Sequence, residues 1–143
     1  MAWRLVMPRS WLLLVTVRGN SMTPTYEDGD RLLVWTWRRS KYLAGEVIVF
    51  RTPYHIGELT YLVKRVVACA GGPVPPEVAH RVGGSGREIP AGALVVRGDN
   101  PASLDSRHFG YVCTTAVVGR VLCRLARATR DGAGPRRRSG RER

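Results

Sequence analysis

The chain has 143 residues, a length that suits one domain and leaves no room for a large second one. Hydrophobic residues make up 44% of it, enough for one modest core, and 16 glycines and 9 prolines are typical of many turns between short strands. We therefore expect a mainly β domain. The three cysteines have no Cys-x-x-Cys spacing, which argues against a metal site, and a formal net charge of +12 by itself favours nucleic acid or anionic lipid as a partner.

The N-terminal residues are rich in apolar side chains but interrupted. The longest clean apolar run, 11–17, has seven residues, whereas a membrane-spanning helix needs about 20. No small-residue cleavage site follows the run, which argues against a secretory signal peptide. We interpret residues 1–10 as an N-terminal segment that could be the remnant of a membrane anchor. A buried strand is expected over 11–18, at the start of a domain that comprises residues 11–128.

Turn residues separate the later strand candidates. A glycine-rich and proline-rich segment at 71–76 breaks the longest candidate, and residues 77–90 are expected to be loop with short extended pieces. The last strand is expected to run into a short helical end near residue 125. The strands expected after the first one are 31–37, 46–51, 59–70, 93–97 and 117–122.

The C-terminal end carries much of the positive charge. Residues 124–143 contain eight arginines against one aspartate and one glutamate, and they lack the apolar residues needed to fold. We interpret 129–143 as a disordered basic tail. It is either a solvated solubility tail or a contact for anionic lipid headgroups, and nucleic acid is the least favoured partner.

One serine occupies a turn that follows a predicted strand. Gly19 permits a positive φ angle or close backbone approach, and Pro24 prevents the chain from continuing as a strand. Ser21 between them would present its hydroxyl at a sheet edge, with its own N–H free to bind an oxyanion. A serine in such a setting is usually only a turn residue, so its significance depends on whether a base lies near it.

Histidine and lysine are the candidate bases. A triad of Ser21 and His108 with Asp105 or Asp99 is one option. The other is Lys64, which lies in an apolar strand candidate and shares a face with its neighbours at i±2. If that face is buried, desolvation lowers the pKa of the amine and makes it a base near neutral pH. If the face points outward, Lys64 is simply solvated.

Five segments, taken in order, resemble the signal peptidase I family, which includes the mitochondrial inner membrane protease branch. They are Val-x-Gly-x-Ser-Met-x-Pro-Thr (17–25), Gly-Glu-Val-Ile-Val-Phe (45–50), Lys-Arg-Val-Val (64–67), Gly-Asp-Asn followed by Ser-x-Asp-Ser-Arg-x-Phe-Gly (98–110) and Val-Gly-Arg-Val (118–121). The resemblance covers roughly residues 15–122. It implies an antiparallel β fold of the signal peptidase and LexA type with few short helices.

The resemblance also implies roles for individual residues. Ser21 matches the nucleophile, Lys64 the general base, and Ser103 the serine whose hydroxyl orients the lysine amine. Arg65 is expected to pair with Asp99 as structural support.

Further matches concern structure and substrate binding. Asp105 and Arg107 match structural charged residues of the last segment. Met22 would form part of the binding floor, and Val17 and Val63 would line shallow apolar subsites for small side chains, as in Ala-x-Ala sequences.

Taken together, the resemblance predicts a serine endopeptidase that needs no cofactor or metal. Its substrates would be precursor proteins or leader peptides, cleaved at a membrane surface with the catalytic site on the extracytoplasmic side. One departure is Gly19, which stands where some bacterial relatives have a serine that completes the oxyanion hole. Glycine at this position is also found in the Gram-positive and mitochondrial branches.

Two other functions are compatible with parts of the sequence. A LexA-type self-cleaving regulator would share the Ser/Lys dyad and could cut at Ala91-Gly92, but no helix-turn-helix precedes Ser21. A basic domain that binds nucleic acid or lipid would account for the charge. Whether Cys113 and Cys123 pair across a hairpin stays open at this point.

Overall fold

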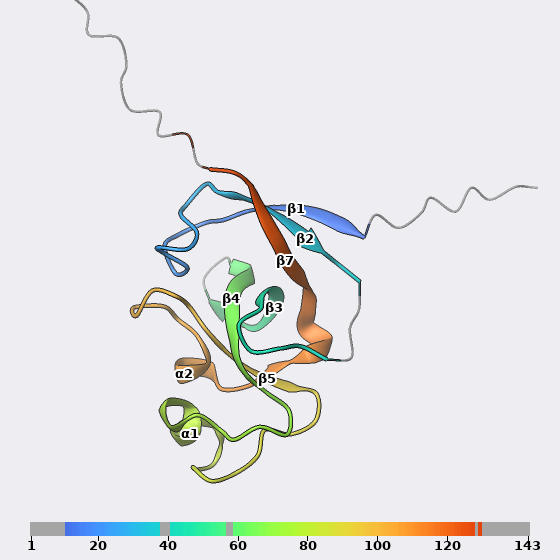
Figure 1. Cartoon of the computed structure of the whole chain (residues 1–143). Coiled ribbons are helices and arrows are strands. Elements are labelled where there is room, and N and C mark those ends of the chain that lie inside the picture. Colours follow the sequence, from blue (N-terminus) through green and yellow to red (C-terminus); the bar gives the residue numbers. More distant parts are fainter. Residues whose placement is uncertain (1–10, 38–40, 57–58, 128, 130–143) are drawn as a thin grey trace, which may run out of the picture.

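Seven strands form one antiparallel sheet in the order β1-β2-β7-β3-β4-β5-β6. The computed structural model describes residues 11–37, 41–56, 59–127 and 129 (Figure 1). The expected mainly β, antiparallel fold is confirmed. In chain order the elements are β1 (Leu12–Thr16), β2 (Arg31–Trp35), β3 (Val47–Ile56), β4 (Leu59–Cys69), α1 (Pro76–Val82), β5 (Ala93–Arg97), α2 (Ser106–Phe109), β6 (Val112–Cys113), a 3-10 turn (Thr114–Ala116) and β7 (Val117–Ala126).

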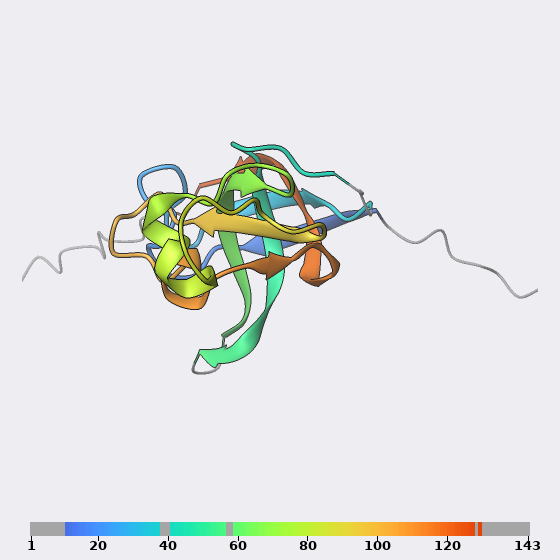
Figure 2. The same ribbon diagram turned by 90° about the horizontal axis from the view of Figure 1, so that it is seen from below.

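The last strand holds the sheet together. β7 lies between β2 and β3, so the N-terminal pair β1–β2 joins the remaining strands only through the end of the chain. β3 and β4 form a long hairpin that projects from the body of the molecule (Figure 2). α1 and α2 lie together beside β5 at the far end of the sheet (Figure 1). The N-terminal segment 1–10, and the predicted tail apart from residue 129, lie outside the described residues.

The core consists of three apolar clusters on the sheet. The central cluster is built around Ile48, Phe50 and Val66, which are fully buried. A second cluster packs under α1, and a third joins the turn that carries Ser21 to side chains of β2 and β3. The buried members of this third cluster are Val17, Leu32, Val34 and Val49.

Three sequence-based expectations are wrong in detail. The strand near residue 12 forms, but it is not buried, because β1 is an edge strand and Leu12, Leu13 and Leu14 are each more than 40% exposed. Residues 76–82 are not loop but the helix α1, which begins at a proline suited to a first turn and ends at the left-handed Gly83. The expected helical end near residue 125 is strand, because β7 pairs with β2 as far as Ala126.

Candidate active site

The turn between β1 and β2, residues 17–30, carries Ser21. The neck of the turn is closed by the Val17 N–H, which donates to the Asp30 carbonyl at 2.8 Å. Gly19 adopts φ +80°, the left-handed conformation that its position requires. Met22 is almost completely buried and fixes the chain directly after Ser21 in the core. The nucleophile candidate is therefore held on a short, anchored backbone.

Lys64 lies directly against Ser21. Its Nζ is 2.6 Å from Ser21 Oγ, so the two groups share a hydrogen bond across 43 residues of sequence. Leu62, Lys64 and Val66 all point to the buried side of β4, and only 2% of Lys64 is exposed. Of the two alternatives that the sequence left open for this strand face, the buried one is correct, and the solvated alternative for Lys64 is wrong.

Burial changes the protonation of Lys64. Desolvation lowers the pKa of its ammonium group from 10.5 to about 8, because a charge is costly to hold away from water. The carboxylate of Asp105 acts in the opposite direction and raises the pKa, but it does not cancel the desolvation. A substantial fraction of Lys64 is therefore neutral near pH 8, with a lone pair available for a proton.

A cleft of about 440 Å³ opens in front of these two groups. Its walls come from the end of β1, from the turn after it and from β4. Tyr61 and Leu104 are exposed at its rim. The lining includes all three predicted substrate-binding residues together with both members of the dyad, namely Val17, Met22, Val63, Ser21 and Lys64.

Ser103 is buried near Ser21 but makes no hydrogen bond to Lys64. Its Oγ has no hydrogen-bond partner among the described residues, so the expected bond to the lysine amine is not made in this arrangement. Gly98 lies next to Ser103. In the sequence it is the glycine of the Gly-Asp-Asn segment, and no role of its own was predicted for it. A Cβ at Gly98 would lie within 3.0 Å of the Ser103 side chain and of the Ser21 carbonyl oxygen. Only glycine fits there.

Asp99 and Arg65 form the predicted ion pair. Arg65 Nε donates to Asp99 Oδ1 at 2.9 Å and its Nη2 to Oδ2 at 2.6 Å, a two-pronged geometry that is among the stronger surface contacts. Hydrogen bonding from Arg65 lowers the pKa of Asp99, and Thr25 Oγ1 also donates to this carboxylate. Because Thr25 belongs to the turn that carries Ser21, the pair supports this turn from the side of β4 and β5.

Asp105 organises the segment after β5. It is completely buried, and its carboxylate accepts hydrogen bonds from the Gly98 N–H and from the backbone and guanidinium of Arg107. Burial alone would raise the pKa of Asp105, but these hydrogen bonds and the Arg107 charge outweigh it and hold the pKa below 3.8. Asp105 also begins α2 as its N-cap.

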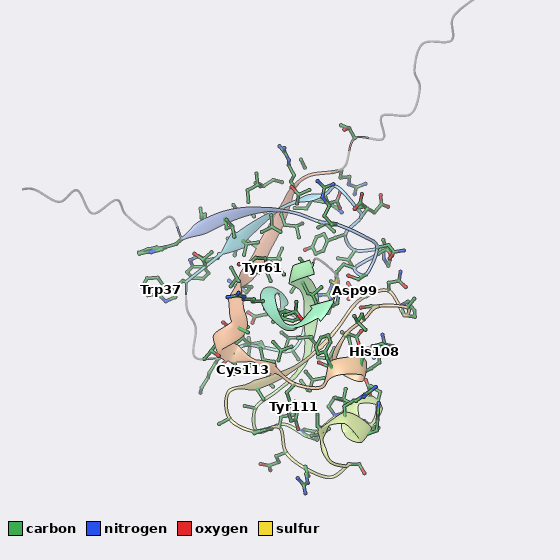
Figure 3. All side chains as sticks on the ribbon, turned by 180° about the vertical axis from the view of Figure 1, so that it is seen from behind. Trp37, Tyr61, Asp99, His108, Tyr111 and Cys113 are labelled. Carbon is green, nitrogen blue, oxygen red and sulfur yellow. The ribbon has the colours of Figure 1, made fainter. Side chains whose placement is uncertain are left out.

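His108 does not form a triad with Ser21. Its ring is half exposed, and its Nδ1 accepts a hydrogen bond from the Asp105 N–H at 3.3 Å within the capping box of α2. Figure 3 shows His108 on the same side of the molecule as Asp99 and far from Trp37 and Cys113. The structure thus places Lys64, and not His108, at the serine hydroxyl.

One backbone donor at the serine is open. The Gly19 N–H is occupied by Asp28 Oδ1 at 2.7 Å. In the part of the chain that the structure describes, the Ser21 N–H has no acceptor.

Over the described residues no group of three or more acidic, histidine or cysteine side chains is arranged to hold a metal, and Cys69, Cys113 and Cys123 are free thiols. No helix in the described segments is long and apolar enough to cross a membrane.

Comparison with known proteins gives a consistent result. A family model described as signal peptidase, peptidase S26, matches residues 2–80 and 77–126, which include every segment that carries a site candidate. The chain is 29% identical to a probable signal peptidase I-1 of Synechocystis sp., over 81% of this chain and 72% of that protein. It is 32% identical to the mitochondrial ATP-independent inner membrane protease subunit 1a of Arabidopsis thaliana, over 76% of this chain and 67% of that protein.

Proposed function

Because this chain belongs to the signal peptidase family, peptidase S26, we propose that it cleaves signal or leader peptides with Ser21 as nucleophile and Lys64 as general base. The resemblance inferred from the order of the sequence motifs is confirmed by the family match. The protein is a serine endopeptidase of the signal peptidase type. The dyad, the cleavage specificity and the membrane association go beyond that conclusion and are argued below.

The contact between Lys64 Nζ and Ser21 Oγ is the observation that carries the proposed dyad. At 2.6 Å a neutral amine accepts the hydroxyl proton while Oγ attacks the carbonyl carbon of the scissile bond. The oxyanion that forms is stabilised by the open Ser21 N–H. The Lys64 ammonium then protonates the leaving amine, and the acyl part of the substrate stays bound to Ser21 Oγ as an ester. Water activated by neutral Lys64 hydrolyses this ester and restores both groups.

The pKa of about 8 supports this role for Lys64. At pH 7 an amine with that pKa is about 10% neutral, whereas a solvated lysine is neutral to only about 0.03%. The desolvated site thus raises the concentration of the active base about 300-fold. The rate should consequently rise with pH and level off above about pH 8.

The apolar floor of the cleft supports cleavage after small residues. Val17 and Met22 are 4% and 1% exposed, so their side chains fill the floor and leave only a shallow surface for the substrate. A methyl group fits such a surface, whereas a large side chain would need the core to open. We therefore assign the cleft to substrates with Ala-x-Ala-like sequences before the scissile bond.

Exposed apolar side chains at the start of β1 support association with a membrane surface. Trp11 and Trp37 pack edge to face at 4.8 Å, and both are about half exposed, next to the exposed leucines of β1. Tryptophan is favoured at membrane interfaces because one edge of its ring is apolar and the other binds water. The apolar surface lies at the start of β1 and the cleft at its end, so this short strand connects the two, and the surface would hold the site at the extracytoplasmic face where precursors emerge.

Peptide cleavage tests the dyad. Wild type and the variants Ser21→Ala, Lys64→Ala and Lys41→Ala are compared on an Ala-x-Ala peptide, with products identified by mass spectrometry. We expect kcat to fall at least about 10³-fold for Ser21→Ala and Lys64→Ala, as for other nucleophile–base pairs. Lys41, the only other lysine, is exposed and its variant should match wild type. Undiminished cleavage by either dyad variant would disprove the assignment.

Vesicle binding tests the surface. We expect Trp11→Ser to weaken sedimentation with phosphatidylglycerol-containing vesicles about tenfold, since a buried aromatic side chain contributes roughly 1.5–3 kcal/mol. Leu43→Ser is the control, because Leu43 is 62% exposed but lies in the loop before β3. If binding disappears in high salt and is equal for all variants, basic residues account for the affinity, and the apolar surface is not the membrane contact.

A further inference from the structure

The turn that carries Ser21 is held from a second side by the C-terminal strand. Arg124 on β7 lies opposite Leu32 on β2, and its side chain reaches back toward the turn. Its Nη1 donates both to the Asp30 carboxylate at 2.9 Å and to the Thr25 carbonyl at 3.0 Å. The guanidinium also lies over the Tyr26 ring, 5.9 Å from the centroid. One side chain thus contacts three residues of the turn.

A backbone hydrogen bond connects the residues that Arg124 contacts with the residue after Ser21. The Tyr26 N–H donates to the Met22 carbonyl at 2.9 Å, and Met22 follows Ser21. Asp30 closes the neck of the turn through its backbone and is 2% exposed, so its negative charge needs a partner. Arg124 supplies a positive charge at this buried group while it holds the far side of the turn.

We propose that Arg124 is a positioning residue, which clasps the turn 17–30 through Asp30, Thr25 and Tyr26 and so fixes Ser21 Oγ at Lys64 Nζ. This inference rests on the proposed Ser/Lys mechanism. It adds a residue that lies beyond the last motif of the family resemblance, which ends at Val121. The C-terminal strand thereby becomes part of the support of the active site, opposite the Asp99–Arg65 pair.

A second arginine on the same strand provides a matched control. Arg120 makes an ion pair of 3.0 Å with the mostly buried Glu46 and lies over the Trp35 ring at 5.6 Å. The two arginines therefore have the same kinds of contact on β7. Only Arg124 contacts the turn that carries Ser21.

The experiment compares Arg124→Met, Arg124→Lys and Arg120→Met in steady-state cleavage, with rates corrected for the folded fraction measured by circular dichroism. For Arg124→Met we expect kcat to fall about 10- to 100-fold with KM changed less than about threefold, because a displacement near 1 Å costs rates of this order. Arg124→Lys keeps the charge and should recover part of the loss. Arg120→Met should retain the kcat of wild type.

A double variant separates position from charge. Asp30→Asn with Arg124→Met removes the buried negative charge together with the guanidinium that faces it, so it should fold more stably than Arg124→Met alone. Its kcat should stay low, because the contacts from β7 to the turn are still missing. The pH at which kcat/KM levels off should also rise in Arg124→Met, since a displaced turn admits water to Lys64. If the double variant recovers the full kcat of wild type, Arg124 acts only by stabilising the fold against the buried Asp30 charge, and the proposal is overturned.

Hydrogen exchange tests the clasp without turnover. The Thr23 and Tyr26 amides, both bonded within the turn, should exchange faster in Arg124→Met than in Arg120→Met. Equal exchange in the two variants, or equal kcat after correction for folding, would refute a positioning role for Arg124. If wild type itself does not cleave Ala-x-Ala peptides, the proposed function fails, and the exchange rates still decide whether the clasp exists.

Discussion

The base of the proposed dyad should weaken the fold that contains it. Lys64 is buried, and desolvation lowers its pKa from 10.5 to about 8. Replacing it by methionine keeps an unbranched side chain of similar length and removes the charge. We therefore expect Lys64→Met to abolish cleavage and, at neutral pH, to increase the free energy of unfolding.

The magnitude follows from proton linkage. The unfolded chain keeps the Lys64 proton up to about pH 10.5, whereas the folded protein loses it near pH 8. Between these values the unfolded state binds more protons, so the stability of wild type rises with pH. Below pH 8 the cost of the buried ammonium is constant at about 3 kcal/mol, and at pH 10 about 1 kcal/mol remains.

Urea denaturation at pH 7 and pH 10 measures this difference. Lys64→Met should exceed wild type by up to about 3 kcal/mol at pH 7, and the gap should shrink by about 2 kcal/mol at pH 10. Lys41→Met removes the same charge from an exposed position and should show no such pH dependence. A gap between wild type and Lys64→Met that is equal at both pH values would refute the lowered pKa and the base assignment that relies on it.

Two other substitutions probe the segment after β5. Gly98→Ala places a methyl group against the Ser21 carbonyl and should lower kcat at least about tenfold, because the nucleophile is displaced; wild-type kcat would show that the neighbouring backbone yields. Asp105→Asn removes the charge partner of Arg107 from a fully buried position and should lower the unfolding free energy by about 3 kcal/mol in urea titrations. A loss below about 1 kcal/mol would contradict the central role given to this carboxylate.

The sequence predicted local features better than long-range ones. Period-two alternation places Lys64 on one strand face with Leu62 and Val66, which needs no knowledge of the neighbouring strands, although it does not say whether that face is buried. The exposure of β1 did not follow, because an apolar strand has the same sequence pattern at a sheet edge as at its centre. The edge position of β1 depends on β7, which is the last strand in the sequence and lies between β2 and β3.

Contacts between distant residues explain what was missed at the site. Arg124 and the turn that carries Ser21 are brought together by strand order, and no motif spacing records that relation. The requirement for Gly98 likewise depends on how closely two loops approach each other. By contrast the Arg65–Asp99 pair was accessible, because the family resemblance relates the two segments that carry it. The helix α1 was missed because its seven residues are too short for a helical period to emerge.

The ion pair between Asp105 and Arg107 explains how a lysine can be both buried and basic. A bare buried carboxylate at Asp105 would attract the ammonium strongly and keep it protonated. Arg107 donates two guanidinium hydrogen bonds to that carboxylate, at 2.9 Å each, so Lys64 experiences the weaker field of an ion pair. Desolvation then remains the dominant influence on the amine. We therefore expect Arg107, which touches neither Ser21 nor Lys64 among the described contacts, to help keep Lys64 neutral near pH 8.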